Sequence, residues 1–439
     1  MLTERSGGSL QRQLQSLSGQ ASGRQARRLA AWTSGALRRR RTLGVVLNGV
    51  AKRALKGRPP QVVALLELFG YALLFHAEPL EELLASLHEL GESKKVSAHV
   101  ERVLTRLDAA IAERRDEPGE GDDLLPLGRE RSIRFKKPVL GVSQRGPAGE
   151  LGILYSLPDD LAGAWVAAFG EEQARELARA ANDPAPLFLR ANTLRTTPAE
   201  LSAALREAKV DVLPTEVETA LRLGPGGGSF RHTDPWRAGH FVVQDLTAQR
   251  VAPLLAPQPG ERVLDLCAAP GGKTCHLAEL ARDQADVLAT DLKAGRLRRV
   301  EQNAERLGLR SIRTQRLDGK RAAEELAEAG PFDAILVDAP CSNTGVVRRR
   351  PEARWRYDSR SQRRLTTEQS RLLEAVVPLL APGGRLVYSL CSIEPDEGHE
   401  RVEELLAAHP ELERVHEELW LPGPERGDGG FAALLRLRG

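Results

Sequence analysis

The chain has 439 residues, of which 41% are hydrophobic, 28% charged and 4% aromatic, a composition that suits a soluble globular protein of two or three domains. No apolar run approaches the roughly 18 residues of a membrane span, and the N-terminus lacks the apolar core of a signal peptide. Four cysteines without C-x-x-C spacing argue against a disulfide framework and a structural zinc site, so we expect a cytoplasmic protein without a metal. The sequence does not determine the oligomeric state, and a monomer is the default expectation.

Charge is distributed unevenly along the chain. The net charge is +3, yet residues 1–60 contain 13 Lys and Arg against one acid, Glu4, and the remainder is mildly acidic. A basic end on an acidic body predicts contact with a polyanion, most often RNA or DNA. For residues 1–22 alone, a solvated basic tail is the preferred interpretation.

The first half of the chain changes pattern twice. Apolar residues spaced by three and four, with Gly and Pro at the joins, predict an all-α domain over residues 23–112. Residues 113–150, which include a charged stretch rich in Gly and Pro, are expected to form a linker. Helical patterns around the strand-like "PLFLRANTLR" then predict a small α+β subdomain over residues 151–225.

The remaining segment, residues 226–439, is expected to form a Rossmann-like α/β domain. Beyond residue 261, short apolar strand patterns alternate with helical patterns, as in "RVLDLCA" followed by "KTCHLAELA". Such alternation predicts a parallel sheet covered by helices on both faces. Ligands of these sheets bind beyond the carboxyl ends of the strands, and the motifs described next fall at those ends.

The stretch "DLCAAPGGKT" joins a strand to a helix start. It is not a Walker A motif, because the position five residues before Gly272 holds Cys267 instead of glycine. Two glycines allow a ligand to approach the backbone, and the helix N-terminus favours an anion. The residues that we expect to line this cofactor loop are Cys267, Ala268, Ala269, Pro270, Gly271, Gly272 and Lys273.

Three aspartates end the strands that follow. Asp291 lies 20 residues beyond Gly271, the spacing at which a carboxylate accepts hydrogen bonds from ribose hydroxyls. Asp318 ends the next strand, where an adenine amino group would lie, and Asp338 ends the fourth. An adenosine ligand that carries a carboxylate in place of a triphosphate fits this set, and S-adenosylmethionine is such a ligand.

Cysteines occupy two further strand ends, at Cys341 and Cys391. A free cysteine is commonly a small buried hydrophobe, and we keep that interpretation for Cys267 and Cys275. A cytosine methyltransferase has a use for the other two, because a thiolate that adds to C6 makes C5 nucleophilic. A carboxyl group near N3, for which Asp338 is placed, would stabilise the charge shift, and the base must leave its stack.

These stretches resemble a known family. The region from about residue 150 onward is similar to the Sun/Nop2-type RNA cytosine-C5 methyltransferases in "LRANTL", "VQDLTAQ", "DLCAAPGGKT", "DAPCSNTG" and "GDGGFAALLR". Residues 23–112 resemble the NusB-like domain that precedes the catalytic region in the bacterial 16S rRNA enzymes. The resemblance implies that Cys391 is the nucleophile, that Cys341 assists product release, and that the 267–273 loop with Asp291, Asp318 and Asp338 contacts S-adenosylmethionine.

The sequence departs from the family pattern at several positions. Leu390 replaces the usual Thr, Asn343 a common Gly, and Glu397-Gly398-His399 an acidic E-N-E segment. The first hypothesis is methylation of cytosine C5 in 16S rRNA during small-subunit assembly. The alternatives are a tRNA substrate and a non-catalytic RNA-binding assembly factor, although retention of both cysteines and the aspartates argues against the latter.

Two arginine-rich stretches are candidates for RNA contact. Residues 348–364 hold eight arginines and two acids, interleaved with Trp355 and Tyr357, and this mixture is typical of single-stranded RNA binding. The "RRRR" at residues 38–41 predicts either contact with the same RNA or the charged start of a helix.

Overall fold

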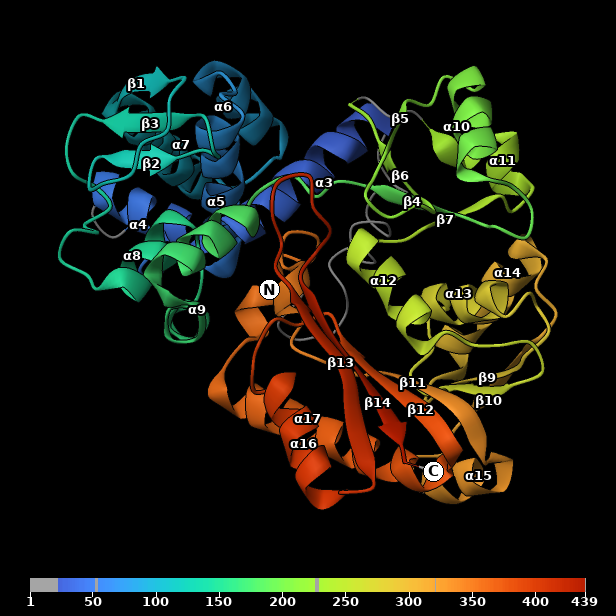
Figure 1. Cartoon of the computed structure of the whole chain (residues 1–439). Helices are drawn as coiled ribbons and strands as arrows, with labels where there is room; N and C mark the ends of the chain where they lie inside the picture. Colours follow the sequence, from blue (N-terminus) through green and yellow to red (C-terminus); the bar gives the residue numbers. More distant parts are fainter. Residues whose placement is uncertain (1–22, 52–53, 226–228, 320, 439) are drawn as a thin grey trace. The chain divides into compact units, whose positions relative to one another are not determined.

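The computed structural model describes residues 23–51, 54–225, 229–319 and 321–438, so the predicted basic tail lies outside the described residues. The chain divides into two compact units (Figure 1). The first extends to Pro184 and also includes Val347–Ser359. The second comprises Ala185–Val346 and Arg360–Gly439. The chain therefore leaves the second unit after Val346, at the end of the loop that contains Cys341, and returns to it at Arg360.

The first unit begins with helices, as the spacing of apolar residues predicts. These are α3 (Gly23–Arg38), α4 (Arg40–Val50), α5 (Pro60–Phe75), α6 (Leu80–Glu89) and α7 (Lys94–Ala110). Helix α5 is apolar along most of its length and packs against α3, α4 and α7. Gly70 of α5 lies where Leu43 and Leu47 of α4 and Leu107 of α7 converge. The helical N-terminal region is confirmed.

Residues 113–150, which composition predicts to be a linker, are a folded part of the first unit. Strands β1 (Ile111–Arg115), β2 (Leu124–Pro126) and β3 (Ser132–Phe135) form an antiparallel sheet in the order β1-β3-β2. Leu125, Ile133 and Phe135 are buried. Pro118, Gly119, Gly121 and Gly128, which suggest a linker, lie in the connections between these short strands, and Pro126 ends β2.

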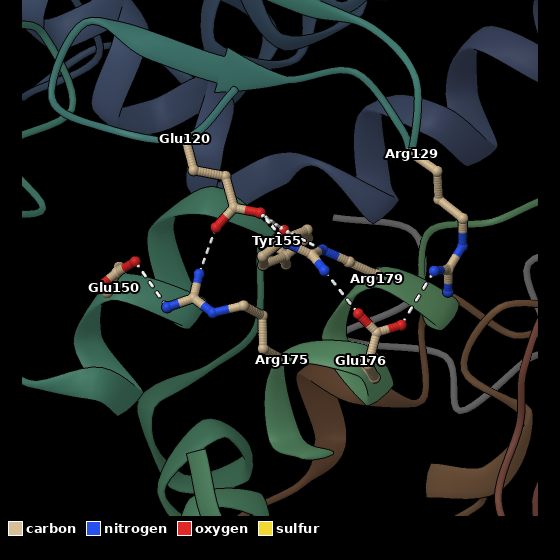
Figure 2. A network of polar contacts seen from close by, with 7 residues as sticks. All are labelled: Glu120, Arg129, Glu150, Tyr155, Arg175, Glu176 and Arg179. Atoms are coloured by element: carbon tan, nitrogen blue, oxygen red, sulfur yellow. Dashed lines mark hydrogen bonds and ion pairs between the residues drawn. The ribbon is translucent and has the colours of Figure 1, made fainter. Parts of the chain in front are cut away.

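A polar network fastens this sheet segment to the helices that follow it, α8 (Pro147–Leu154) and α9 (Asp159–Ala180) (Figure 2). Glu120 accepts hydrogen bonds from Tyr155, from Arg175 and, at 2.7 Å, from Nη2 of Arg179. Arg129 donates to Glu176 at 3.0 Å. These contacts place α8 and α9 in the first unit, and Gly170, with φ +77°, marks a kink inside α9.

The second unit opens with a small antiparallel sheet. Strands β4 (Phe188–Ala191), β5 (Val212–Pro214), β6 (Ala220–Leu223) and β7 (Phe241–Val243) have the order β5-β6-β4-β7. Helices α10 (Pro198–Glu207) and α11 (Asp234–Arg237) accompany them. Thr197 and Glu200 form a capping box at the start of α10, which explains why the helix begins at the Thr-Pro pair.

A seven-stranded sheet forms the centre of the second unit, in the order β10-β9-β8-β11-β12-β14-β13. Its strands are β8 (Arg262–Asp265), β9 (Asp286–Asp291), β10 (Ile312–Arg316), β11 (Phe332–Asp338), β12 (Leu380–Leu390), β13 (Leu412–Trp420) and β14 (Gly430–Leu437). Strands β8 to β12 are parallel, whereas β14 and β13 are antiparallel to their neighbours. The Rossmann-like core is confirmed as a mixed sheet.

Helices cover both faces of this sheet, as predicted. One core contains residues of α12 (Leu246–Leu255), α13 (Gly272–Leu280) and α14 (Ala294–Leu307). The other contains residues of α15 (Ala322–Ala329), α16 (Ser359–Val376) and α17 (His399–Ala408). Neighbouring strand residues such as Val263 and Leu264 belong to opposite cores because side chains alternate along a strand. Within the described residues, no helix is long and apolar enough to cross a membrane.

Candidate active site

The "DLCAAPGGKT" stretch forms the turn between β8 and α13. The N–H of Gly271 donates to the carbonyl of Ala268 at 2.7 Å, and the N–H of Ala268 donates to Thr290 of β9 at 3.0 Å. Gly271 has φ +98°, and a Cβ there would lie 2.9 Å from the Cα of Val300. Only glycine fits this close approach of the loop to α14.

The outer side of the loop is fastened by α14. Arg296 donates to the carbonyl of Ala269 at 2.8 Å, and Asn303 donates to the carbonyl of Pro270 at 3.0 Å. These bonds hold the loop carbonyls, whereas the first N–H groups of α13 have no acceptor within the helix. The loop therefore offers donors and a positive dipole end to an anionic group.

Asp265, which the sequence analysis leaves out of the site, ends β8 underneath this loop. It is fully buried, and its Oδ2 accepts a hydrogen bond from Thr274 at 2.6 Å, while Oδ1 has no hydrogen-bond partner among the described residues. Burial, helped by the nearby carboxylates of Asp338 and Asp291, raises the pKa of Asp265 to about 7. Its position at the end of the first parallel strand was the signal available in the sequence.

The predicted aspartates end strands at the same edge of the sheet. Asp291, the last residue of β9, is buried, accepts the N–H of Lys293 at 2.9 Å and forms an ion pair with Arg296 at 3.1 Å. Asp318 follows the adjacent strand β10 and is exposed. Asp338 ends β11, and its register partner on β12 is Ser389.

Lys273, which we expected among the loop residues, directs its ammonium toward Asp338. Nζ donates to Oδ1 of Asp338 at 2.7 Å, and Ser389 Oγ donates to the same oxygen at 3.4 Å. Burial alone would lower the pKa of Lys273, but Asp338 and Cys391 outweigh it, so the pKa is raised. A charged ammonium thus lies beside the Asp338 carboxylate and interacts electrostatically with Cys391.

The two strand-end cysteines lie in one site. Cys341 and Cys391 follow the adjacent parallel strands β11 and β12, and the N–H of Gly345 donates to the carbonyl of Cys391 at 3.2 Å. Burial raises the pKa of Cys341 well above its ordinary value, and the charges of Glu397 and Cys391 raise it further. Cys275 is buried in α13 with a pKa raised to about 12 by burial, in agreement with its interpretation as a buried hydrophobe.

The departures from the family pattern have local explanations. Asn343 has φ +63°, a left-handed conformation that Asn and Gly adopt most readily, and its side chain donates to the carbonyl of Cys341 at 2.8 Å. Leu390 is buried in the core. His399 bonds Glu417 at 2.7 Å on the surface, whereas Glu397 is fully buried and contacts both cysteine loops.

The prediction that residues 348–364 bind RNA is wrong for Arg354 and Trp355, in the middle of this segment. Arg354 is fully buried in the first unit and donates to the carbonyls of Ala181 at 2.8 Å and Ser156 at 3.2 Å. Trp355 Nε1 donates to the carbonyl of Leu37 at 2.9 Å. The Arg354 guanidinium and the Trp355 indole N–H, which we expected to contact RNA, are therefore hydrogen-bonded to main-chain carbonyls. This part of the segment stabilises the first unit.

The arginines at 38–41 also have protein partners. Arg38 donates to the carbonyl of Arg348 at 2.9 Å, Arg39 is buried against Phe75, and Arg41 pairs with Asp159 at 2.6 Å. These contacts favour the structural alternative for this stretch over RNA contact.

The "LRANTL" and "VQDLTAQ" motifs join the small sheet to the helix of the cofactor loop. Arg190 of β4 forms a buried, bidentate ion pair with Glu279 of α13 and donates to Gln244 at 2.7 Å. Both motifs therefore set the position of the small sheet against α13. No group of His, Cys, Asp or Glu side chains in the described part of the chain is arranged to hold a metal ion.

Comparison with known proteins places this site in a family. Residues 252–435 match the family model "16S rRNA methyltransferase RsmB/F", and residues 157–226 match the ferredoxin-like domain of RsmF/B-like methyltransferases. Ribosomal RNA small subunit methyltransferase B of Yersinia pseudotuberculosis (serotype O:1b, strain IP 31758) and that of Yersinia pestis are each 39% identical over 271 residues. The match spans 60% of this chain and 62% of each relative.

Solved structures agree with this assignment. The crystal structure of PH0851 has a TM-score of 0.74 at 25% identity and covers 94% of this chain and 90% of its own. A methyltransferase homolog protein from Pyrococcus horikoshii has a TM-score of 0.59 at 26% identity, covering 65% of this chain and 97% of its own. Residues 157–226 and 252–435 are therefore the regions of this chain that match the ferredoxin-like and methyltransferase parts of the RsmB/F family.

Proposed function

We propose that the protein transfers a methyl group from S-adenosylmethionine to C5 of a cytosine in RNA, and that its substrate is 16S rRNA. The observation that carries this proposal is the placement of Cys341 and Cys391 on adjacent strand ends, beside the Lys273–Asp338 pair and the cofactor loop. The names of the curated relatives, rRNA small subunit methyltransferases, support the choice of substrate.

The residues at the sheet edge fit S-adenosylmethionine. The unpartnered Oδ1 of buried Asp265 suits the α-ammonium of the methionine part, and the N-terminal amides of α13 suit its carboxylate. We assign Asp291 to the ribose hydroxyls and Asp318 to the adenine amino group. Leu292, which is 53% exposed, offers an apolar face to the adenine ring. When bound, this cofactor supplies an electrophilic methyl group on a sulfonium.

The side chains then divide the work of transfer. The Cys391 thiolate forms a bond to C6 of the cytosine, and the C5=C6 electron pair shifts so that C5 can attack the methyl group. We assign to the Lys273 ammonium the stabilisation of the thiolate, and to Asp338, with which it pairs, the stabilisation of the charge that develops around N3. In the release step a base takes the C5 proton, the S–C6 bond breaks and Cys391 leaves as a thiolate; we place Cys341 in this step, as the group that receives the proton.

The first unit and the ferredoxin-like region complete the proposal. The helical region at residues 23–112 is assigned a NusB-like role in RNA binding, alongside the small sheet of the second unit. An rRNA substrate, free or within an assembling small subunit, places the enzyme in the cytoplasm, where we expect a monomer. Methylation of tRNA and a non-catalytic assembly role are the competing functions.

The test offers labelled S-adenosylmethionine with unmodified 16S rRNA or with unmodified tRNA to the wild-type protein and to Cys391→Ala. The RNA is digested to nucleosides, and the label is located by chromatography and mass spectrometry. The proposal expects 5-methylcytidine in 16S rRNA from the wild type alone. Label only in tRNA would overturn the substrate, and RNA binding without transfer to either RNA would favour the assembly role.

A further inference from the structure

The turn after Cys391 contains a buried carboxylate for which the mechanism above has no use. Glu397 lies between β12 and α17 and is fully buried. Its Oε2 accepts the N–H of Ser342 at 2.9 Å, and its Oε1 accepts hydrogen bonds from the Ser342 hydroxyl and, at 2.7 Å, from the Ser392 hydroxyl. Ser342 and Ser392 directly follow Cys341 and Cys391.

Helix α16 supplies the remaining donors. Gln369 donates to Oε2 of Glu397 at 2.9 Å and also to the carbonyl of Pro340 at 2.8 Å, while Gln362 donates to Oε1 at 3.3 Å. Among the described residues, these partners are uncharged. Hydrogen bonds, instead of a cation, therefore offset the cost of burying the carboxylate.

The two cysteine loops also contact each other around this carboxylate. The hydroxyls of Ser342 and Ser392 lie 3.0 Å apart, and Ser392 Oγ lies 3.0 Å from Thr344 Oγ1. The Tyr388 hydroxyl donates to the main-chain carbonyl of Glu397 at 2.8 Å, which fixes the backbone that carries the side chain. One side chain thus connects the loop after β11, the loop after β12 and helix α16.

A carboxylate suits this arrangement best, because both oxygens of Glu397 act solely as acceptors and face donors. A glutamine of equal size would direct an N–H₂ group toward the two serine hydroxyls and the Gln362 amide, and it would exchange charge-assisted hydrogen bonds for weaker neutral ones. An aspartate would withdraw the carboxylate by one methylene from at least one loop. The site therefore demands both the charge and the length of Glu.

We propose that Glu397 is a positioning residue that sets the Cys341 loop and the Cys391 loop at the spacing that attack on C6 and release of the methylated base require. This inference rests on the proposed methyltransferase function and extends it. Ser342 and Ser392 connect Glu397 to the two loops. We therefore expect Ser392 to affect the attack by Cys391, and Ser342 to affect the release that involves Cys341.

The charge of Glu397 supports this division of roles. Its carboxylate adds to burial in raising the pKa of the Cys341 thiol, whereas the Lys273 ammonium interacts electrostatically with Cys391. The two cysteines thus interact with groups of opposite charge, a carboxylate for Cys341 and an ammonium for Cys391.

The test compares the wild type with Glu397→Gln, Ser342→Ala, Ser392→Ala and the control Glu400→Gln. Glu400 is an exposed residue of the first turn of α17. For each protein, the single-turnover methylation rate, the KM for 16S rRNA, the Kd for S-adenosylmethionine and the fraction of RNA trapped as covalent adduct on a denaturing gel are measured. Circular dichroism melting checks that each variant is folded.

We expect Glu397→Gln to slow single-turnover methylation by about tenfold to a hundredfold, with KM and Kd within about twofold of wild type. Ser342→Ala should increase the trapped adduct, Ser392→Ala should decrease it, and Glu400→Gln should match the wild type. Equal rates for Glu397→Gln and wild type, or the same direction of change in adduct for both serine variants, would overturn the inference. Absence of methylation by the wild-type protein would instead overturn the proposed function.

Discussion

The buried carboxyl of Asp265 predicts a specific pH dependence of stability. Its pKa is raised from 3.8 in the unfolded chain to about 7 in the folded protein, chiefly by burial. This shift in pKa corresponds to a free-energy preference of at most about 4 kcal/mol for the protonated carboxyl over the ionised one in the folded protein. Since the folded protein holds a proton that the unfolded chain releases, the free energy of unfolding falls as pH rises from about 4 through 7.

Substitution of Asp265 by Asn removes this titration and keeps the size of the side chain. At pH 5 the unfolded chain has already released this proton while the folded protein keeps it, so Asp265→Asn should be more stable than wild type by about 1.6 kcal/mol at most. At pH 8 we expect Asp265→Asn to be more stable than wild type by up to about 4 kcal/mol, the full linkage free energy.

Urea denaturation followed by circular dichroism at pH 5, 6, 7 and 8 measures this difference. Groups other than Asp265 titrate in both proteins, so the difference between the two curves isolates its contribution. Asp234→Asn, at a residue whose side chain is 93% exposed, is the control and should shift the curves equally at each pH. A difference between wild type and Asp265→Asn that is constant from pH 5 to pH 8 would refute the reasoning.

Three further substitutions test other parts of the structure. Gly271→Ala should weaken S-adenosylmethionine binding about tenfold in calorimetry, because a positive φ costs about 1–3 kcal/mol and its Cβ would meet Val300; Gly295→Ala, in open space on α14, should bind normally. Arg190→Met should lower the free energy of unfolding by about 3–5 kcal/mol, because it leaves Glu279 buried and unpaired. A double variant that also carries Glu279→Leu should regain most of this loss. No recovery would contradict the role of this ion pair in joining the small sheet to α13. Arg354→Met should cost about 2–4 kcal/mol yet leave the salt dependence of RNA affinity unchanged, whereas a shallower slope would restore Arg354 as a phosphate contact.

Features carried by local patterns were predictable from the sequence. Strand-end residues such as Asp291, Asp338, Cys341 and Cys391 come after apolar runs, and parallel strands bring their carboxyl ends to one edge whatever the details of packing. The positive φ of Gly271 follows from the same logic, because a tight strand-to-helix turn requires glycine.

Features that depend on tertiary partners were not predictable. The sequence singles out Glu397 only as part of an altered segment, because all of its side-chain donors except Ser392 come from residues 28 to 55 positions away along the chain. The arginines around Arg354 have the composition of an RNA-binding stretch, yet Arg354 itself donates to carbonyls of Ser156 and Ala181, which follow the ends of α8 and α9 and are distant in the sequence. The antiparallel end of the sheet, β14 and β13, also lacked a local signal, since antiparallel and parallel strands differ in pairing more than in sequence.

The roles of the two cysteines are tested most directly by trapping the covalent intermediate. Wild type, Cys341→Ala and Cys391→Ala are each incubated with S-adenosylmethionine and labelled, unmodified 16S rRNA, and the products are separated on a denaturing gel. The mechanism predicts methylated RNA from the wild type, a persistent protein–RNA adduct with Cys341→Ala, and neither product with Cys391→Ala. An adduct that persists with Cys391→Ala and is absent with Cys341→Ala would show that the roles are reversed, and methylation by both variants would contradict covalent catalysis by this pair.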